Sequence, residues 1–190
     1  MIMLEEFSHF KGKYLTRSEK IQKKVTDLLL ESKLSDSQRE SSLIWELRHS
    51  AGVCQIGRIL AQKRKLDIEI AEIISILHDV YSIVSGSYKM HAQRSSEIAN
   101  NILKDSKEFK SEEIEIIVEA VAHHSEKDIY SDKPYVELIK DADVFDCSLY
   151  QRAYSGYKLY KSKEIFDETV KRVKKVRKEL ALPVKPILRQ

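Results

Sequence analysis

One stretch near the middle of the chain decides the fold: Ile68-Glu69-Ile70-Ala71-Glu72-Ile73-Ile74-Ser75-Ile76-Leu77-His78-Asp79-Val80. Asp67 precedes it as an N-cap, because an aspartate can accept hydrogen bonds from the backbone N–H groups of a first helical turn. Apolar side chains cover most sides of the helix that this stretch would form, and such a helix must be surrounded by other elements. The pattern therefore predicts a central helix from Ile68 to about Val80 that ends in His78-Asp79.

The composition of the remaining chain favours helices around this centre. Among 190 residues there are only 5 glycines and 3 prolines, whereas hydrophobic residues make up 42% and charged residues 33%. Scarcity of the two strongest helix breakers favours a mostly helical protein, and the apolar content excludes a disordered chain. Length and composition together predict one all-α domain with short extensions.

Apolar side chains at helical spacing predict further helices on both sides of the central one. These helices cover residues 18–33 and 38–61, begin near residue 90, at 111 and at 134, and end with one over about 163–180, while 81–90 is predicted to be a loop. We expect an N-terminal helical extension over 1–36, the main domain over 37–150, and a basic C-terminal helix over 151–190 that packs on it.

Imidazoles and carboxylates recur on the inward faces of the predicted helices. His49 lies in an apolar stripe with Trp45 and Val53, His91 opens the buried side of its helix, and Asp143 lies one turn after Ile139. Burying such groups without partners is costly, so their convergence from different helices is best explained by a metal ion. Histidine and aspartate ligands favour a catalytic site, because structural zinc sites are usually rich in thiolates.

The two cysteines do not belong to this pattern. Cys54 and Cys147 match no zinc-ribbon spacing and are too few for a disulfide framework. We expect both to be reduced residues of the core.

With these residues in place, the sequence resembles the HD-domain superfamily of metal-dependent phosphohydrolases. The matching stretches are Arg48-His49-Ser50, Ile76-Leu77-His78-Asp79-Val80, His91-Ala92-Gln93-Arg94-Ser95-Ser96-Glu97-Ile98-Ala99, His123-His124-Ser125 and Ile139-Lys140-Asp141-Ala142-Asp143. They span roughly residues 40–150. The resemblance implies a single-domain, all-α helical bundle of the HD-domain type with about seven to nine helices.

The resemblance also implies a set of metal ligands. Carried over residue by residue, it makes His49, His78, Asp79 and Asp143 the ligands of the core metal. His91 and His124 match positions that bind a second ion in two-metal members, where the Asp of His-Asp bridges both ions, and that line the substrate pocket in single-metal members. His123 is a weaker candidate, because the glycine and proline signature of the subgroup with paired histidines is absent. The expected cofactor is one or two divalent ions per chain, of Mn, Co, Ni, Zn, Fe or Mg.

The activity implied by the resemblance is hydrolysis of a phosphoester or phosphoanhydride, of a nucleotide or a related small phosphorylated molecule, by a metal-activated water. Asp79 would act as a metal ligand, and a nearby cation would stabilise the charge on the phosphoryl oxygens. Arg94 and Lys127 are favoured for that role over Arg48, Lys89 and Arg152. Tyr81 and Tyr88 are candidates for stacking on a nucleobase, and Asp141 for a hydrogen bond to a metal ligand.

Two other classes of function stay open at this point. One is an oxygenase, because some relatives with six His and Asp ligands hold two irons and oxidise a small molecule with oxygen. The corresponding set here would be His49, His78, Asp79, His91, His124 and Asp143. The other class is a non-catalytic regulatory module that binds a metal or a phosphate ligand. Nucleic acid is a disfavoured partner, because the basic segment 151–190, with 12 basic and 4 acidic residues, lacks aromatics along its charged face.

The sequence contains no apolar run long enough for a membrane span and no secretory signal at its N-terminus. We therefore expect a cytoplasmic protein without a membrane partner. For the oligomeric state, a homodimer is one possibility that the sequence leaves open.

Overall fold

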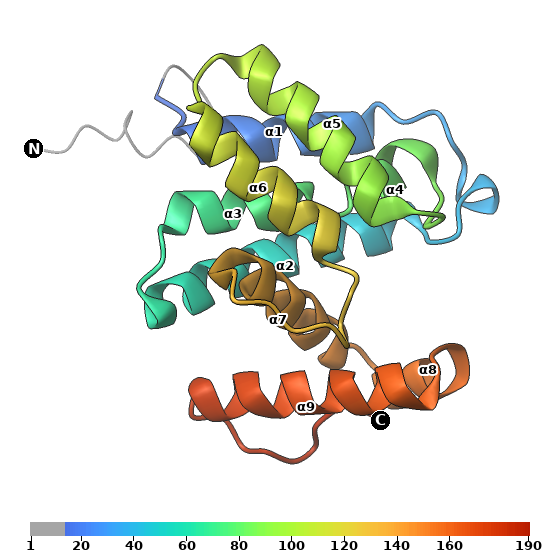
Figure 1. Ribbon diagram of the computed structural model, residues 1–190. Helices are drawn as coiled ribbons and strands as arrows, with labels where there is room; N and C mark the ends of the chain where they lie inside the picture. The colour runs from blue at the N-terminus through green and yellow to red at the C-terminus, as the bar shows by residue number, and fades with distance from the viewer. Residues whose placement is uncertain (1–13) are drawn as a thin grey trace, which may run out of the picture.

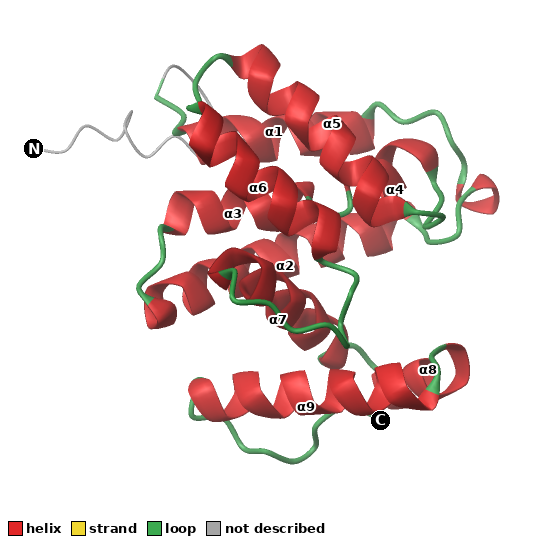
Figure 2. Cartoon of the chain, viewed as in Figure 1, coloured by secondary structure: helices red, strands yellow, loops and turns green. Residues whose placement is uncertain are grey.

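The computed structural model describes residues 14–190, which form helices and loops and contain no strand (Figures 1 and 2). The helices are α1 (Arg17–Leu30), a 3-10 turn η2 (Asp36–Gln38), α2 (Leu43–Arg64), α3 (Ile68–Leu77), α4 (Val80–Ser85), α5 (His91–Ser106), α6 (Ser111–His123), α7 (Pro134–Ser148), α8 (Ala153–Tyr160) and α9 (Lys163–Glu179). The predicted all-α class is confirmed. None of these helices is long and apolar enough to cross a bilayer.

Helix α3 lies at the centre of the bundle, as its apolar pattern predicts. The Asp67 carboxylate caps it by accepting a hydrogen bond of 3.0 Å from the Ile70 N–H. Ile73, Ile74 and Leu77 are completely buried, because α1, α2, α6 and α7 all pack around α3. This central helix determines where its C-terminal residues, and so the candidate ligands, are placed.

The chain after α3 differs from the prediction in one respect. The segment predicted as a loop begins with the short helix α4, which runs from Val80 to Ser85 and ends at Gly86 with a φ of 73°. Val80 and Ile83 are buried, so the apolar stretch of α3 continues through a break at His78-Asp79 into a second helix. The break turns the chain and points both side chains of the pair inward.

Helix α8 is also absent from the prediction. It is only eight residues long, and Ala153 is its single buried residue, so it has too few turns for an apolar period to be recognised. Figure 1 shows α8 at one end of α9, in the layer below the rest of the bundle.

Both ends of the described chain pack on the same core. Ile21 and Val25 of α1 belong to the apolar cluster around α3, and Val173 and Val176 of α9 are completely buried against α7. Helix α9 therefore packs against α7. The exact limits of the main domain at 37 and 150 stay a prediction, and residues 1–13 of the predicted extension lie outside the described part.

Candidate metal centre

Six side chains from different helices converge between α2, α3, α5, α6 and α7. They form overlapping groups that could hold a metal ion: His49, His78, Asp79, His91, His124 and Asp143. His78 is completely buried, and at most 5% of His49, Asp79 and His124 is exposed. The structure thus brings together all six residues that the family resemblance implies, whereas their binding of metal stays a prediction.

The orientation of three of the imidazoles is set by backbone carbonyls. The Nδ1 atoms of His78, His91 and His124 lie 2.7, 2.9 and 2.8 Å from the carbonyl oxygens of Ser75, Tyr88 and Val121. A carbonyl oxygen can only accept, so each Nδ1 carries the proton. In the neutral rings, each Nε2 therefore presents its lone pair to the centre of the cluster.

Burial keeps two of these rings in the form that can bind a metal. It lowers the pKa of His78 to about 4 and also lowers the pKa of His91. Both imidazoles are consequently neutral near pH 7, as a metal ligand must be.

The Nε2 atoms face one another in two pairs, with Asp79 between them. His49 and His78 approach to 3.3 Å, and His91 and His124 to 3.1 Å, through their Nε2 atoms. Where both rings of a pair are neutral, their lone pairs repel at this separation unless a cation lies beside them. Oδ2 of Asp79 is 3.4 Å from His78 Nε2, and Oδ1 is 3.2 Å from His124 Nε2 and 3.5 Å from His91 Nε2.

Asp79 therefore offers one carboxylate oxygen to each pair of imidazoles. Its Oδ1 is buried and forms no hydrogen bond with residues of the described chain. An unpaired anionic oxygen beside imidazole lone pairs is costly to bury without a cation. The donor set fits divalent ions, and its division into two pairs bridged by one carboxylate fits two of them.

His49 is oriented by a carboxylate instead of a carbonyl. Its Nδ1 lies 2.7 Å from Oδ2 of Asp146, and Trp45 stacks on its ring at a centroid distance of 5.3 Å. Burial alone would lower the pKa of His49, but Cys147 and the carboxylates of Asp143 and Asp146 raise it well above its ordinary value. A metal ion bound at Nε2 would take the place of the second proton of this ring.

Two residues of this arrangement were not predicted. Asp146, rather than Asp141, holds a candidate ligand, and Gly52 makes room for it, because a Cβ at Gly52 would overlap with the Asp146 carboxylate. Asp141 instead accepts hydrogen bonds from Arg64, Arg172 and Lys175. Asp146 lies one helical turn after Asp143, a spacing that could have indicated its role.

Lys127 lies at the centre, where its predicted role requires it. Its ammonium contacts the Asp143 carboxylate and donates a hydrogen bond of 2.5 Å to the His124 carbonyl oxygen. Although burial raises the pKa of Asp143, Lys127 and His49 hold it well below its usual range. Asp143 is therefore an anion at neutral pH, and its Oδ1 lies 3.4 Å from His49 Nε2.

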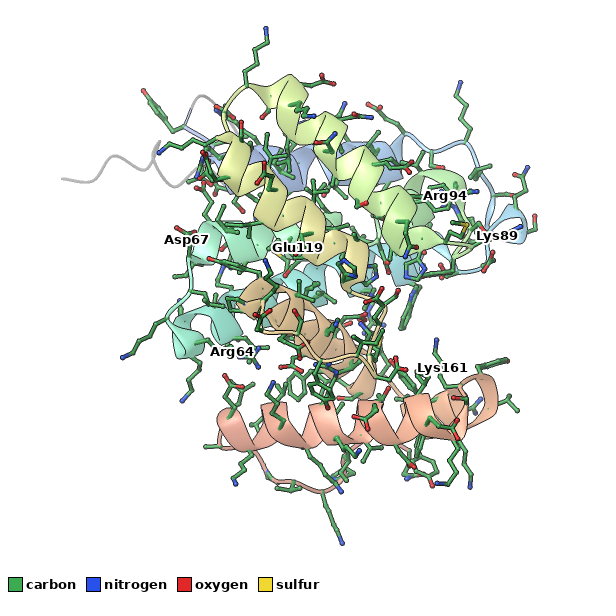
Figure 3. All side chains as sticks on the ribbon, viewed as in Figure 1. Arg64, Asp67, Lys89, Arg94, Glu119 and Lys161 are labelled. Carbon is green, nitrogen blue, oxygen red and sulfur yellow. The ribbon has the colours of Figure 1, made fainter. Side chains whose placement is uncertain are left out.

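Three other candidates lie away from the centre. The Arg94 guanidinium contacts the Tyr81 hydroxyl, and Figure 3 shows this arginine beside α4 and α5, on the outside of the bundle. Neither residue lines the cavity beside the metal centre, so their positions do not support the roles predicted for them. His123 is half-exposed, and its Nδ1 lies 2.9 Å from Glu126 Oε2 rather than near the other ligands.

A cavity of about 530 Å³ opens onto the centre. His49, Asp79, His91, Lys127 and Asp143 form part of its wall, together with Tyr88 of the predicted loop. Cys147 also lines it, so only the buried Cys54 matches the prediction of a core thiol. The remaining wall comes mainly from residues 150–161, which carry no recognisable motif.

Comparison with known proteins identifies the type of fold. A crystal structure of a predicted HD superfamily hydrolase from an uncultured Thermotogales bacterium aligns with a TM-score of 0.52 and 19% identity, over 85% of this chain and 90% of that one. Ribonuclease Y of Chlorobium phaeobacteroides is 31% identical over 103 residues, which are 54% of this chain. The chain spans only 18% of the length of that relative.

The family model of the HD domain matches residues 47–147, just over half of the chain. The match begins two residues before His49 and ends at Cys147, so it encloses all six residues of the centre. The chain belongs to the HD domain family.

Proposed function

We propose that the protein is a metal-dependent hydrolase of phosphoesters or phosphoanhydrides. The observation that carries the proposal is the arrangement of two imidazole pairs, whose Nε2 atoms face each other on either side of Asp79, beside a cavity. His49, His78, Asp79 and Asp143 would hold one ion, and Asp79, His91 and His124 the second. A divalent cation bound there would lower the pKa of a water molecule toward neutrality and polarise a phosphoryl oxygen.

Lys127 would stabilise negative charge on the phosphoryl group. An ammonium group has three N–H donors, and two of them are used by Asp143 and the His124 carbonyl. The third is available to a ligand, because Lys127 lines the cavity. Its position is fixed by the two contacts, so no reorganisation is needed when charge develops on the substrate.

The substrate class that we favour is a nucleotide or a related small phosphorylated molecule. The cavity has a volume suited to a small ligand and is lined by aromatic side chains as well as by the centre. An RNA phosphodiester is a second candidate, supported by the similarity to a protein named Ribonuclease Y.

Hydrolysis assays with two neighbouring histidines test the proposal. We would measure release of product from bis(p-nitrophenyl) phosphate, the common nucleotides and a short RNA, each with Mn, Co, Ni, Zn, Fe or Mg added. We expect metal-dependent hydrolysis that is lost in His124→Ala and retained in His123→Ala, because only His124 belongs to the centre.

Three outcomes would contradict the proposal. One is wild-type protein that hydrolyses none of these substrates with any of the metals. Another is equal activity in the two histidine variants. The third is turnover that requires iron and consumes oxygen, which would favour the di-iron oxygenase instead.

A further inference from the structure

The wall of the cavity that faces the metal centre comes from a part of the chain outside the family match. The contributing residues lie between 150 and 161, in α8 and its flanks: Tyr150, Gln151, Arg152, Ala153, Gly156, Tyr157, Tyr160 and Lys161. The HD domain match ends at residue 147. The segment that completes the cavity therefore lies outside the matched domain.

Neither the backbone conformation nor the packing around Gly156 requires a glycine. It lies inside α8, where a glycine is less favourable than an alanine, and its φ is not positive. At Gly52 and Gly57 an added Cβ would overlap with Asp146 and Ser75, but at Gly156 it would meet nothing within 4 Å. Because Gly156 lines the cavity, this open space belongs to the cavity.

The side chains around this space suit a flat aromatic group. Trp45 and Tyr150 pack against each other with ring centroids 4.7 Å apart, and Tyr157 and Tyr160 line the same cavity from α8. Aromatic faces of this kind bind nucleobases by stacking, with little dependence on which base is present. A bare backbone at Gly156 would let a ring lie directly on the helix.

Two cations of the same wall suit an anionic part of the ligand. Arg152 and Lys161 line the cavity, and Figure 3 shows Lys161 at the junction of α8 and α9. Among residues 14–190, neither forms an ion pair with a carboxylate. Their charges are therefore available to a phosphate group of a bound ligand.

We propose that α8 and its flanks bind the nucleobase of a nucleotide against Gly156, with Arg152 and Lys161 contacting its phosphates. The proposal rests on the proposed function, since it takes the metal centre as the place of the phosphate that is cleaved. It assigns the choice of substrate to residues 150–161, which lie outside the matched domain.

Fluorescence of Trp45 provides a binding assay that is independent of hydrolysis. Trp45 is the only tryptophan of the chain and lines the cavity. We would titrate the full chain, without added metal and with EDTA, with ADP, GDP, CDP, UDP and pyrophosphate. At least one nucleotide should quench the fluorescence, and pyrophosphate, which lacks a base, should bind at least tenfold more weakly.

Two leucine substitutions on the same helix separate a contact with ligand from a change in folding. Gly156→Leu fills the space of the cavity, whereas Ser155→Leu adds the same side chain at the exposed neighbouring position outside the cavity. We expect Gly156→Leu to weaken nucleotide binding at least tenfold while Ser155→Leu leaves it unchanged. The melting temperatures and circular dichroism spectra of both variants should match those of the wild type, because leucine is a good helix former.

The outcomes distinguish this inference from the proposed function. If no nucleotide quenches Trp45, or if Gly156→Leu binds like the wild type, the inference is overturned, even when bis(p-nitrophenyl) phosphate is hydrolysed. If nucleotides bind and Gly156→Leu blocks them but no substrate is hydrolysed with any metal, the inference stands and the proposed function falls. Should Gly156→Leu fail to fold, Arg152→Ala replaces it. We expect this variant to lose at least threefold in nucleotide affinity, and an unchanged affinity would overturn the inference.

Discussion

At the scale of single residues, each imidazole of the metal centre is oriented by the hydrogen bond that its Nδ1 proton forms. Three rings donate it to backbone carbonyls three residues earlier in the chain, and His49 donates it to Asp146 of α7. The six residues of the centre could be predicted, because their order along the chain matches a known pattern. The pairing of His49 with Asp146 depends on the tertiary fold, since the two residues are 97 positions apart, and its sequence signal is the position of Asp146 one turn after Asp143.

Gly52 provides a prediction at this scale. In Gly52→Ala, the new methyl group would occupy the place of the Asp146 carboxylate and move it away from His49. Loss of a hydrogen bond to a metal-binding imidazole typically lowers metal affinity about 10–100-fold. Competition with a chelating dye measures this affinity for the variant and for a control, Gln55→Ala, on the exposed face of the same helix. Equal affinities in both variants would show that Asp146 does not position His49.

At the scale of elements, the long amphipathic helices could be predicted and the short ones could not. Helices α5, α6, α7 and α9 begin within a residue of where capping residues, proline and apolar spacing predict. Helices α4 and α8 have only six and eight residues, so neither contains enough turns to show a period. Both nevertheless shape the site, because α4 follows directly from His78-Asp79 and α8 closes the cavity.

A buried ion network attaches α9 to α7. Arg172 is completely buried and binds the carboxylates of Asp141 and Glu137 at 2.9 and 2.8 Å. Its guanidinium also donates a 2.7 Å hydrogen bond to the carbonyl of Lys127, whose side chain lies at the metal centre. The network therefore connects the outer helix to a residue of the site.

The network predicts a large effect on stability from one substitution. Arg172→Ala would leave the Asp141 and Glu137 carboxylates without this partner and lower the free energy of unfolding by about 3–5 kcal/mol, as is typical for a broken buried ion pair. Urea denaturation measures the change. The control is Lys174→Ala on the same helix, which removes an exposed charge outside any ion pair of residues 14–190 and should leave stability unchanged. If both variants were equally stable, the network would not hold α9 in place.

At the scale of the whole molecule, the metal centre lies where most of the bundle meets. Its residues come from α2, the α3–α4 junction, α5, α6 and α7, which are also the helices that pack around the core. The overall class could be predicted, because composition and one apolar helix are sufficient for it. The closing of the cavity by α8 could not, since it depends on how the C-terminal segment folds back over the centre.

This location predicts that metal stabilises the entire fold. An ion at 100 times its dissociation constant adds about 2.7 kcal/mol to the free energy of unfolding when it binds only the folded state. For a domain of this size the melting temperature should rise by roughly 5–10 °C. Differential scanning calorimetry with and without manganese measures the shift, which EDTA should reverse. A shift of the same size in Asp79→Ala would place the stabilising ion elsewhere.

The measurement that tests the central claim most directly is the metal content of the purified chain by inductively coupled plasma mass spectrometry, in the wild type and in Asp79→Ala. Asp79 offers one oxygen to each imidazole pair, so we predict about two divalent ions per wild-type chain after reconstitution and dialysis. Asp79→Ala should retain almost none. Wild-type protein that binds no ion, or an Asp79→Ala variant with an unchanged content, would contradict the account of the site.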